Sequence, residues 1–237
     1  MTRKLAIETL SKDFLLNVDM LECIRRDSAE LMVVSDKGVL LCDKISGAYM
    51  MSTDNMKIAE VMISKIPDEI EMIVGHQEVY YDLLMKKFKC REKMVCYQTL
   101  YNKDKPLKIP TCSAEITILT EEHIRIIMEN YSGVDLANEE YIKERIATKT
   151  MFGAFINSKL CGFIGTHEEG SIGILEVLPM FRGLGIATVL QSVATNDALI
   201  NNRYPYGQVK IGNESSMNLQ KKLGFEISTN TIYWLFK

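Results

Sequence analysis

The stretch that decides the fold reads Leu175-Glu176-Val177-Leu178-Pro179-Met180-Phe181-Arg182-Gly183-Leu184-Gly185-Ile186-Ala187. It begins as an apolar strand, is stopped by a proline, turns through two glycines and continues as a helix that we expect over residues 186–201. A glycine-rich turn at a helix start directs several backbone N–H groups and the helix dipole at one point, which is typical of an anion site. Gly183 and Gly185 let the backbone approach the anion, and Arg182 adds a positive charge. The sequence therefore predicts a phosphate-bearing cofactor.

Three known phosphate-binding turns can be compared with this pattern. The Walker type requires Lys-Ser or Lys-Thr after its last glycine, and neither follows here. The dinucleotide type requires a third glycine where this chain has Thr188, and no clear βαβ unit with an acidic residue follows. The third type, R-x-x-G-x-[GA], is matched by Arg182, Gly185 and Ala187. This turn resembles the coenzyme A pyrophosphate loop of the GNAT acetyltransferase superfamily.

A second segment carries the same resemblance. Residues 213–225, NESSMNLQKKLGF, are similar to the superfamily's N-x-x-[AS]-x-x-L-Y-x-K-x-G-F segment. Asn213 or Ser215 can cap a helix here, and Gly224 can end it. Gln220 stands where the superfamily usually has a tyrosine that acts as general acid, and an amide cannot supply that proton. Water or another tyrosine could serve instead, or the protein is a slow enzyme or a non-catalytic binder. The resemblance covers roughly residues 114–237.

The elements expected in the second half follow the GNAT order, β, α, α, β, β, β, α, β, α, β. Thr120 caps the first expected helix and Asn138 the second, and Asn157-Ser158-Lys159 forms the tip of a hairpin. The expected strands span residues 115–119, 151–156, 160–167, 171–178, 208–211 and 231–236.

The first half predicts a similar order, β, β, β, α, β, α, β. Its expected strands span 31–34, 39–42, 47–52, 69–74 and 94–101, with helices over 55–66 and 78–88. Two pairs of similar short segments support an internal repeat. Residues 74–78 resemble residues 211–215, and residues 84–88 resemble residues 219–223. We therefore expect a mixed α/β fold of two tandem GNAT-like halves, loosely similar to glycine N-acyltransferase-like proteins. The domains would span 1–108 and 109–237, divided at a polar stretch with two prolines.

The first half lacks the phosphate loop, and we expect it to be degenerate. Residues 50–55, MMSTDN, contain no glycine and no arginine, and Asp54 would place a negative charge beside a pyrophosphate. This half would complete the acceptor pocket, extend the sheet or be a structural remnant.

Composition restricts the class of protein further. The chain has 237 residues, 47% of them hydrophobic and 25% charged, which is typical of a soluble globular protein. A net charge of −3 argues against a general nucleic-acid partner. Neither a membrane span nor a signal peptide is indicated, so we expect a cytoplasmic protein. Six cysteines without a C-x-x-C pair, with three histidines, argue against a metal site. Several of the cysteines lie in apolar, strand-like runs, and these are expected to be small core residues.

The resemblance implies a cofactor, acetyl-CoA, and the residues that hold it. The strand that ends at Leu178 would separate from the strand at 208–211, and the pantetheine arm would bond to backbone groups near Leu175 and Val177. These two side chains share a strand face and pack near the acyl group or in the core. The N–H groups from Gly183 to Ala187, those of Leu184, Gly185 and Ile186 included, would hold the pyrophosphate. Asn213 would contact the cofactor or substrate, or act only as a helix cap.

The resemblance also implies a reaction. Glu176 lies at the strand end, in a context similar to that of a glutamate in glycine N-acyltransferases, and is the candidate general base, although a solvated strand residue is an equal interpretation. His167, Glu168 or Glu169 could instead relay a proton through water. The predicted function is transfer of an acetyl group from acetyl-CoA to the primary amine of a small, amino-acid-like acceptor. The alternative is a non-catalytic acyl-CoA sensor. Strand edges in either half could also pair across a homodimer.

Overall fold

The computed structural model describes residues 2–133 and 138–237, and the chain forms two compact units. The first unit contains Met1–Leu100, Gln208–Met217 and Glu226–Lys237, and the second contains Tyr101–Gly207 and Asn218–Phe225. These units differ from the predicted division into 1–108 and 109–237, because the C-terminal strand is hydrogen-bonded within the sheet of the first unit.

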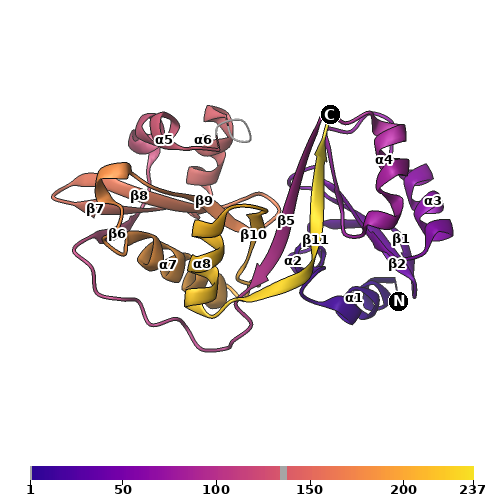
Figure 1. The fold of residues 1–237 in the computed structure, drawn as a ribbon, viewed down its shortest axis with the longest axis horizontal. Coiled ribbons are helices and arrows are strands. Elements are labelled where there is room, and N and C mark those ends of the chain that lie inside the picture. Colours follow the sequence, from indigo (N-terminus) through magenta and orange to yellow (C-terminus); the bar gives the residue numbers. More distant parts are fainter. Residues whose placement is uncertain (1, 134–137) are drawn as a thin grey trace. The chain divides into compact units, whose positions relative to one another are not determined.

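The first unit is built on a seven-stranded sheet in the order β1-β2-β3-β4-β11-β5-β10 (Figure 1). Its strands are β1 (Ala29–Ser35), β2 (Gly38–Asp43), β3 (Tyr49–Thr53), β4 (Met72–Gly75), β5 (Glu92–Leu100), β10 (Tyr206–Lys210) and β11 (Glu226–Phe236). Its helices are α1 (Thr2–Leu10), α2 (Val18–Arg25), α3 (Met56–Lys65) and α4 (Tyr81–Phe88), with short 3-10 turns at Ser11–Asp13 and Glu78–Tyr80.

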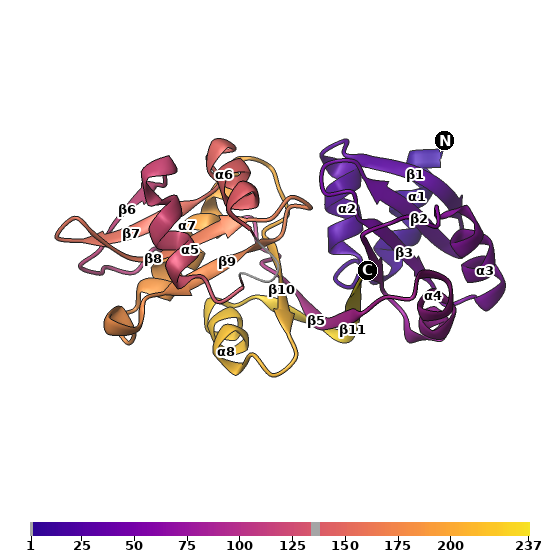
Figure 2. The same ribbon diagram turned by 90° about the horizontal axis from the view of Figure 1, so that it is seen from above.

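Helices cover both faces of this sheet (Figure 2). Leu40 and Met51 pack with α3 and α4 in one apolar core. Because side chains alternate along a strand, Leu41 and Met50 point to the opposite face. Both are fully buried, and α1 packs against β1 and β2. The apolar character of β2 and β3 on both faces therefore follows from their position between two helical layers.

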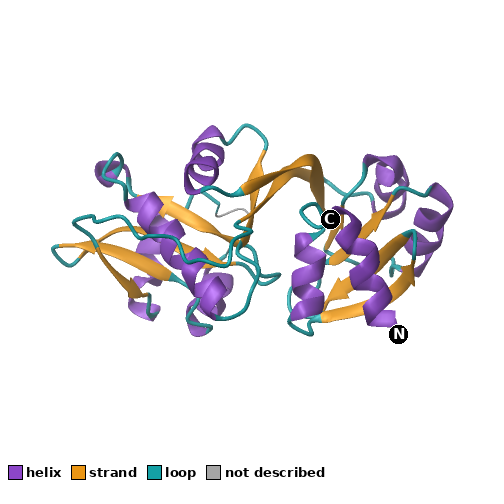
Figure 3. Cartoon of the chain, turned by 90° about the horizontal axis from the view of Figure 1, so that it is seen from below, coloured by secondary structure: helices purple, strands orange, loops and turns teal. Residues whose placement is uncertain are grey.

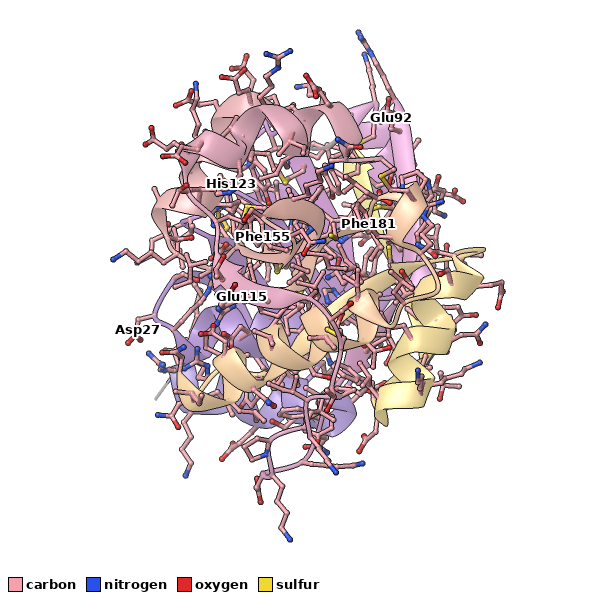
Figure 4. The ribbon with its side chains drawn as sticks, turned by 90° about the vertical axis from the view of Figure 1, so that its left-hand side faces the viewer. Asp27, Glu92, Glu115, His123, Phe155 and Phe181 are labelled. Carbon is pink, nitrogen blue, oxygen red and sulfur yellow. The ribbon has the colours of Figure 1, made fainter. Side chains whose placement is uncertain are left out.

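The second unit is built on a four-stranded antiparallel sheet in the order β6-β7-β8-β9. Its strands are β6 (Glu115–Ile118), β7 (Phe152–Ile156), β8 (Lys159–Thr166) and β9 (Ile172–Val177), and its helices are α5 (Ile124–Asn130), α6 (Glu139–Ala147), α7 (Ile186–Ile200) and most of α8 (Glu214–Leu223). Helices α5 and α6 cover one face of this sheet and α7 covers the other (Figures 1 and 3). An apolar core lies on each face, one with α5 and α6 and one with α7. Before α5, the ring of His123 meets Phe155 edge-on, with centroids 5.3 Å apart (Figure 4).

The predicted elements are confirmed with shifts of a few residues at their ends, but two helices were missed. The prediction began the first half at Leu31, whereas α1 and α2 precede it. In α1 only Ala6 and Leu10 are buried, so its apolar stripe is faint. In α2 the charged residues Asp19 and Glu22 are themselves fully buried, which hides the helical period in the sequence.

With these helices included, the two halves share one element order. Each half contains α, α, β, β, β, α, β, α, β, counted from α1 to β5 and from α5 to β11. β5 and β11 are therefore the final strands of their halves, and they pair antiparallel along most of their length (Figure 1). In the sheet, β11 lies between β4 and β5, and β5 lies between β11 and β10. Each final strand thus inserts between the last two strands of the other half.

The register of the β5–β11 pair agrees with the two pairs of similar segments in the sequence. Cys96 of β5 lies opposite Ile232 of β11. The number of residues between Cys96 and Ile232 along the chain lies between two other spacings. These are the spacings of the similar segments, Gly75 to Gly212 and Leu84 to Leu219. A symmetric exchange of final strands is what an internal duplication would produce, and this register supports the tandem-duplication hypothesis.

Candidate functional site

The turn between β9 and α7 has a backbone conformation that requires glycine. Leu178 leads into a single 3-10 turn at Pro179–Phe181, after which Gly183 and Gly185 both have φ of +80°. Side chains are strained in this left-handed region. A Cβ at either glycine would have no atom within 4 Å, so conformation and not crowding accounts for these glycines.

The start of α7 is open to an anion. Gly185 is the N-cap of this 15-residue helix, and no side chain of residues 2–133 and 138–237 caps it. The first N–H groups of a helix have no acceptor within the helix. The predicted contacts Ile186 and Ala187 supply such groups, and the side chain of Leu184 beside them is 53% exposed. The donors present therefore suit a phosphate group at this end of α7.

β9, which leads into this turn, is an edge strand. Among the described residues its only strand neighbour is β8, whereas β10 pairs in the other sheet. The predicted separation of β9 from the strand at 208–211 stays a prediction, because these two segments belong to different units. Leu175 and Val177 both pack against the apolar core that contains Ile186 of α7, so the prediction that they share a strand face is confirmed.

A bulge in β9 was not predicted from the sequence. Phe163 of β8 lies opposite Glu176 and Gly165 lies opposite Gly173, so β9 has one residue more than β8 between these pairs. Ile174 within the bulge has φ of +52° and is 3% exposed. This conformation is costly for a β-branched residue, which indicates that the surrounding core holds it in place. The bulge therefore contains Ile174 and Leu175 and bends the strand immediately before Glu176.

Glu176, the predicted general base, lies in a defined polar cluster. Its side chain is 13% exposed, and Oε1 lies 3.2 Å from Nη2 of Arg182. Ser132 donates to Oε2 through its hydroxyl at 2.7 Å and its backbone N–H at 3.3 Å. Arg182 also donates through Nε to the carbonyl of Val177 at 3.0 Å. The structure thus places Glu176 beside the loop, but paired with the arginine that the sequence assigned to the phosphate.

Tyr131 is a second titratable group beside this carboxylate, and the sequence did not single it out. Burial, followed by the negative charge of Glu176, raises the pKa of Tyr131 to about 12. Its ring packs edge-on against Phe163 with centroids 6.2 Å apart. A Cβ at Gly133 would lie 2.6 Å from this ring, so a glycine is needed there. Tyr131 lies outside both sequence motifs, which is why no pattern indicated it.

Gln220 and Asn213 have structural roles. Gln220 is 5% exposed, and its amide nitrogen donates to Oε1 of Gln191 on α7 at 3.3 Å. Gln220 therefore joins α8 to α7. Asn213 accepts a hydrogen bond from the N–H of Ser216 at 3.1 Å, which identifies it, and not Ser215, as the cap of α8. Its predicted contact with cofactor or substrate stays a prediction.

His167 belongs to a separate polar cluster at the turn between β8 and β9. Its Nδ1 lies 2.6 Å from the hydroxyl of Tyr141 on α6. Burial lowers the pKa of His167, opposed by the charge of Glu169 and assisted by that of Arg145. Glu168 pairs with Arg145, with 3.4 Å between Oε1 and Nη2. Glu176 lies toward the other end of β9, so the structure does not bring these predicted relay residues to it.

The first half has no open strand edge at the matching place. β3 and β4 pair in parallel, from Tyr49 opposite Ile73 to Met51 opposite Gly75. The carbonyl of Met51 also accepts hydrogen bonds from the N–H of His76 and from the hydroxyl of Tyr80. These bonds occupy the edge of β3. The corresponding edge of β9, the equivalent strand of the second half, is free among the described residues, which agrees with a degenerate first half.

Other predicted features can be compared with the described residues. Within them no group of three or more histidine, cysteine, aspartate or glutamate side chains could hold a metal ion. In the same part of the chain, no helix has the length and apolar character of a membrane span. All six cysteines are free thiols, but only Cys23, Cys96 and Cys161 are buried. These three buried thiols agree with the expectation that several of the cysteines are core residues.

Comparisons with known proteins agree with this fold. Residues 152–235 match the family described as FR47-like protein. No curated protein sequence matches the chain. A Drosophila protein of known structure is similar, with a TM-score of 0.75 at 11% identity over 100% of this chain and 97% of that one.

Two further solved structures carry acetyltransferase descriptions. A GCN5-related N-acetyltransferase-like protein from Streptococcus suis has a TM-score of 0.57 at 14% identity, over 98% of this chain and 100% of that chain. A tandem GNAT protein from the clavulanic acid biosynthesis pathway has a TM-score of 0.50 at 13% identity, over 98% of this chain and 93% of that chain. By fold the chain is similar to these acetyltransferase structures, and its C-terminal part, residues 152–235, matches the FR47-like family.

Proposed function

We propose that this protein is an acyl-CoA-dependent N-acetyltransferase that transfers an acetyl group from acetyl-CoA to the primary amine of a small, amino-acid-like acceptor. The observation that carries the proposal is one loop. The edge strand β9 is followed by a 3-10 turn and then by two left-handed glycines at the start of α7, which no described side chain caps. The carboxylate of Glu176, near the end of β9, pairs with Arg182 of this loop. The first feature suits a pyrophosphate and the second suits an amine.

The roles of the residues follow from this arrangement. When bound, acetyl-CoA supplies a thioester carbonyl that is already activated. The N–H groups from Gly183 to Ala187 bind the pyrophosphate, and the backbone near Leu175 and Val177 holds the pantetheine arm. Glu176 accepts the proton that the acceptor's ammonium must lose before it attacks, directly or through one water. The same proposal includes a cytoplasmic location and no nucleic-acid partner.

A non-catalytic acyl-CoA sensor is the second candidate, and the position of Gln220 favours it. Gln220 is buried against Gln191, so no proton donor stands at the place of the superfamily's usual tyrosine. A binder would need the loop but not a general acid. Under the first proposal, water or another tyrosine must protonate the leaving thiolate. Turnover against a panel of primary amines separates the two candidates, because only the enzyme releases free coenzyme A in an acceptor-dependent manner.

Thermal stability with and without acetyl-CoA tests the shared part of both candidates. Binding to the folded state stabilises it by about 2.7 kcal/mol at a ligand concentration of 100 Kd. We expect a clear rise in Tm for the wild type and a much smaller one for Gly185→Glu, which places a strained, negatively charged side chain at the loop. A well-folded wild type with no shift at millimolar acetyl-CoA would contradict both candidates.

A further inference from the structure

Arg182 lies between the carboxylate of Glu176 and the glycine loop at which the proposed function places a pyrophosphate. Its guanidinium lies 3.2 Å from Oε1 of Glu176, and it immediately precedes the first left-handed glycine of the loop. The side chain of Arg182 is 62% exposed, whereas that of Glu176 is 13% exposed. The cation therefore reaches solvent on the loop side, and the carboxylate is held on the protein side.

The remaining contacts show which partner can move. Glu176 is anchored at Oε2 by both the hydroxyl and the N–H of Ser132. Only Oε1 depends on Arg182. Among the described residues the guanidinium makes one other bond, from Nε to the carbonyl of Val177. A shift of the Nη atoms toward the loop would thus free Oε1 and leave the carboxylate in place.

We propose that Glu176 and the cofactor's pyrophosphate compete for Arg182, so that occupation of the loop releases Oε1 of Glu176 to face the amine. The inference rests on the proposed function and adds a coupling between its two parts. Arg182 is a positioning residue. Without the pyrophosphate its guanidinium pairs with the carboxylate of Glu176. With the pyrophosphate bound, the guanidinium is drawn to the phosphates. An exposed arginine prefers a doubly charged pyrophosphate to a single carboxylate, because the phosphate oxygens accept several of its N–H groups at once.

The coupling predicts that removing the carboxylate strengthens cofactor binding through Arg182. We expect Glu176→Gln to bind free coenzyme A about two- to fivefold more tightly than the wild type, the scale of an exposed ion pair. In an Arg182→Gln background the same substitution should leave the Kd unchanged. Isothermal calorimetry on the full chain measures all four proteins, with far-UV circular dichroism to confirm that each is folded.

A matched control uses another Arg–Glu pair of the same unit. Arg125 and Glu129 on α5 are joined by a 2.8 Å contact between Nε and Oε1, and neither is part of the loop. Glu129→Gln should not change the Kd for coenzyme A.

Three results would overturn the inference. An unchanged or weaker Kd in Glu176→Gln would show that no competition exists. Equal tightening in the Arg182→Gln background would show that the carboxylate repels the cofactor directly, without Arg182. Absence of coenzyme A binding in the wild type and in every variant would remove the proposed function itself, and the inference with it.

Discussion

At the scale of single residues, Glu176 combines a reactive group with an unusually complete set of partners. Arg182 and Ser132 fix its two oxygens, and Tyr131 lies close enough for its pKa to respond to the carboxylate. The raised pKa of Tyr131, about 12, keeps its phenol protonated well beyond neutral pH. The cluster therefore offers a carboxylate that can accept a proton and a neutral phenol beside it.

Removing the carboxylate should remove turnover without unfolding the protein. For Glu176→Gln we expect kcat to fall by about 10²- to 10⁴-fold, the usual contribution of a general base. Steady-state kinetics with the best amine of the panel measures this fall. Glu129→Gln is the control, because it makes the same change of side chain on α5, away from the loop. A wild-type kcat in Glu176→Gln would assign the base to another group.

His167 predicts a dependence of stability on pH. Its pKa is lowered in the folded state by burial, while the unfolded chain titrates near the ordinary value of about 6.5. As pH falls through that value, the unfolded state takes up a proton that the folded state does not. The free energy of unfolding therefore decreases toward acid pH.

Urea denaturation at pH 7.5 and at pH 5.5 checks this sign. We expect the wild type to lose more stability between these pH values than His167→Gln, which has no proton to take up. A smaller loss in the wild type than in the variant would mean that the folded state favours the protonated imidazole.

At the scale of elements, the final strands carry the organisation of the first unit. β11, the final strand of the second half, pairs with β4 on one side and with β5 on the other. It therefore joins two strands of the first half. Tyr233 of β11 lies in the same apolar core as Tyr80 and Leu84. A strand that supplies both hydrogen bonds and core side chains cannot be removed without exposing both neighbours.

Residues 1–108 produced alone should therefore fail to fold. Without β11 this fragment leaves the edges of β4 and β5 unpaired and opens the core around Tyr80. We expect weak near-UV circular dichroism and poor protection of its amides from exchange, and recovery of both when the fragment refolds with residues 109–237. A separate fragment with a cooperative unfolding transition would show that the strand exchange is dispensable.

The elements also show where sequence patterns are sufficient. The hairpins, the caps Asn138 and Asn213 and the glycine loop depend on neighbours in the chain, and local patterns predicted them. Helix α2 was missed because buried Asp19 pairs with His76, a residue far along the chain, at 2.9 Å between Oδ1 and Nε2. A carboxyl group that is hydrogen-bonded in the core to a distant partner looks like a solvent-facing residue in the sequence.

At the scale of the whole molecule, the repeated element order does not produce two equivalent sites. The edge of β3 is occupied by β4 and by bonds to the carbonyl of Met51, and Asp54 follows it without a glycine loop. In the second half β9 keeps a free edge among the described residues, and the glycine loop follows.

One acetyl-CoA should therefore bind per chain. Calorimetric titration of the full protein gives the stoichiometry directly, and Gly185→Glu should abolish the single binding event. A second site of similar affinity, or binding that survives Gly185→Glu, would contradict the assignment of the second half as the only cofactor-binding half.

The sequence by itself determined the loop, its two glycines, Arg182, Glu176 and the order of most elements, because these depend on turn chemistry and on periodicity within short windows. Only the tertiary structure decided that Arg182 pairs with Glu176, that Tyr131 and Ser132 join them, and that Gln220 is a core residue. It also decided that the final strands exchange between halves. Ser132, Gln220 and the exchanged strands meet partners far along the chain, and hydrogen bonding between distant residues leaves no local period in the sequence. Arg182 and Glu176 are close in the chain, but they lie on two sides of a turn, where no helical or strand period predicts their pairing.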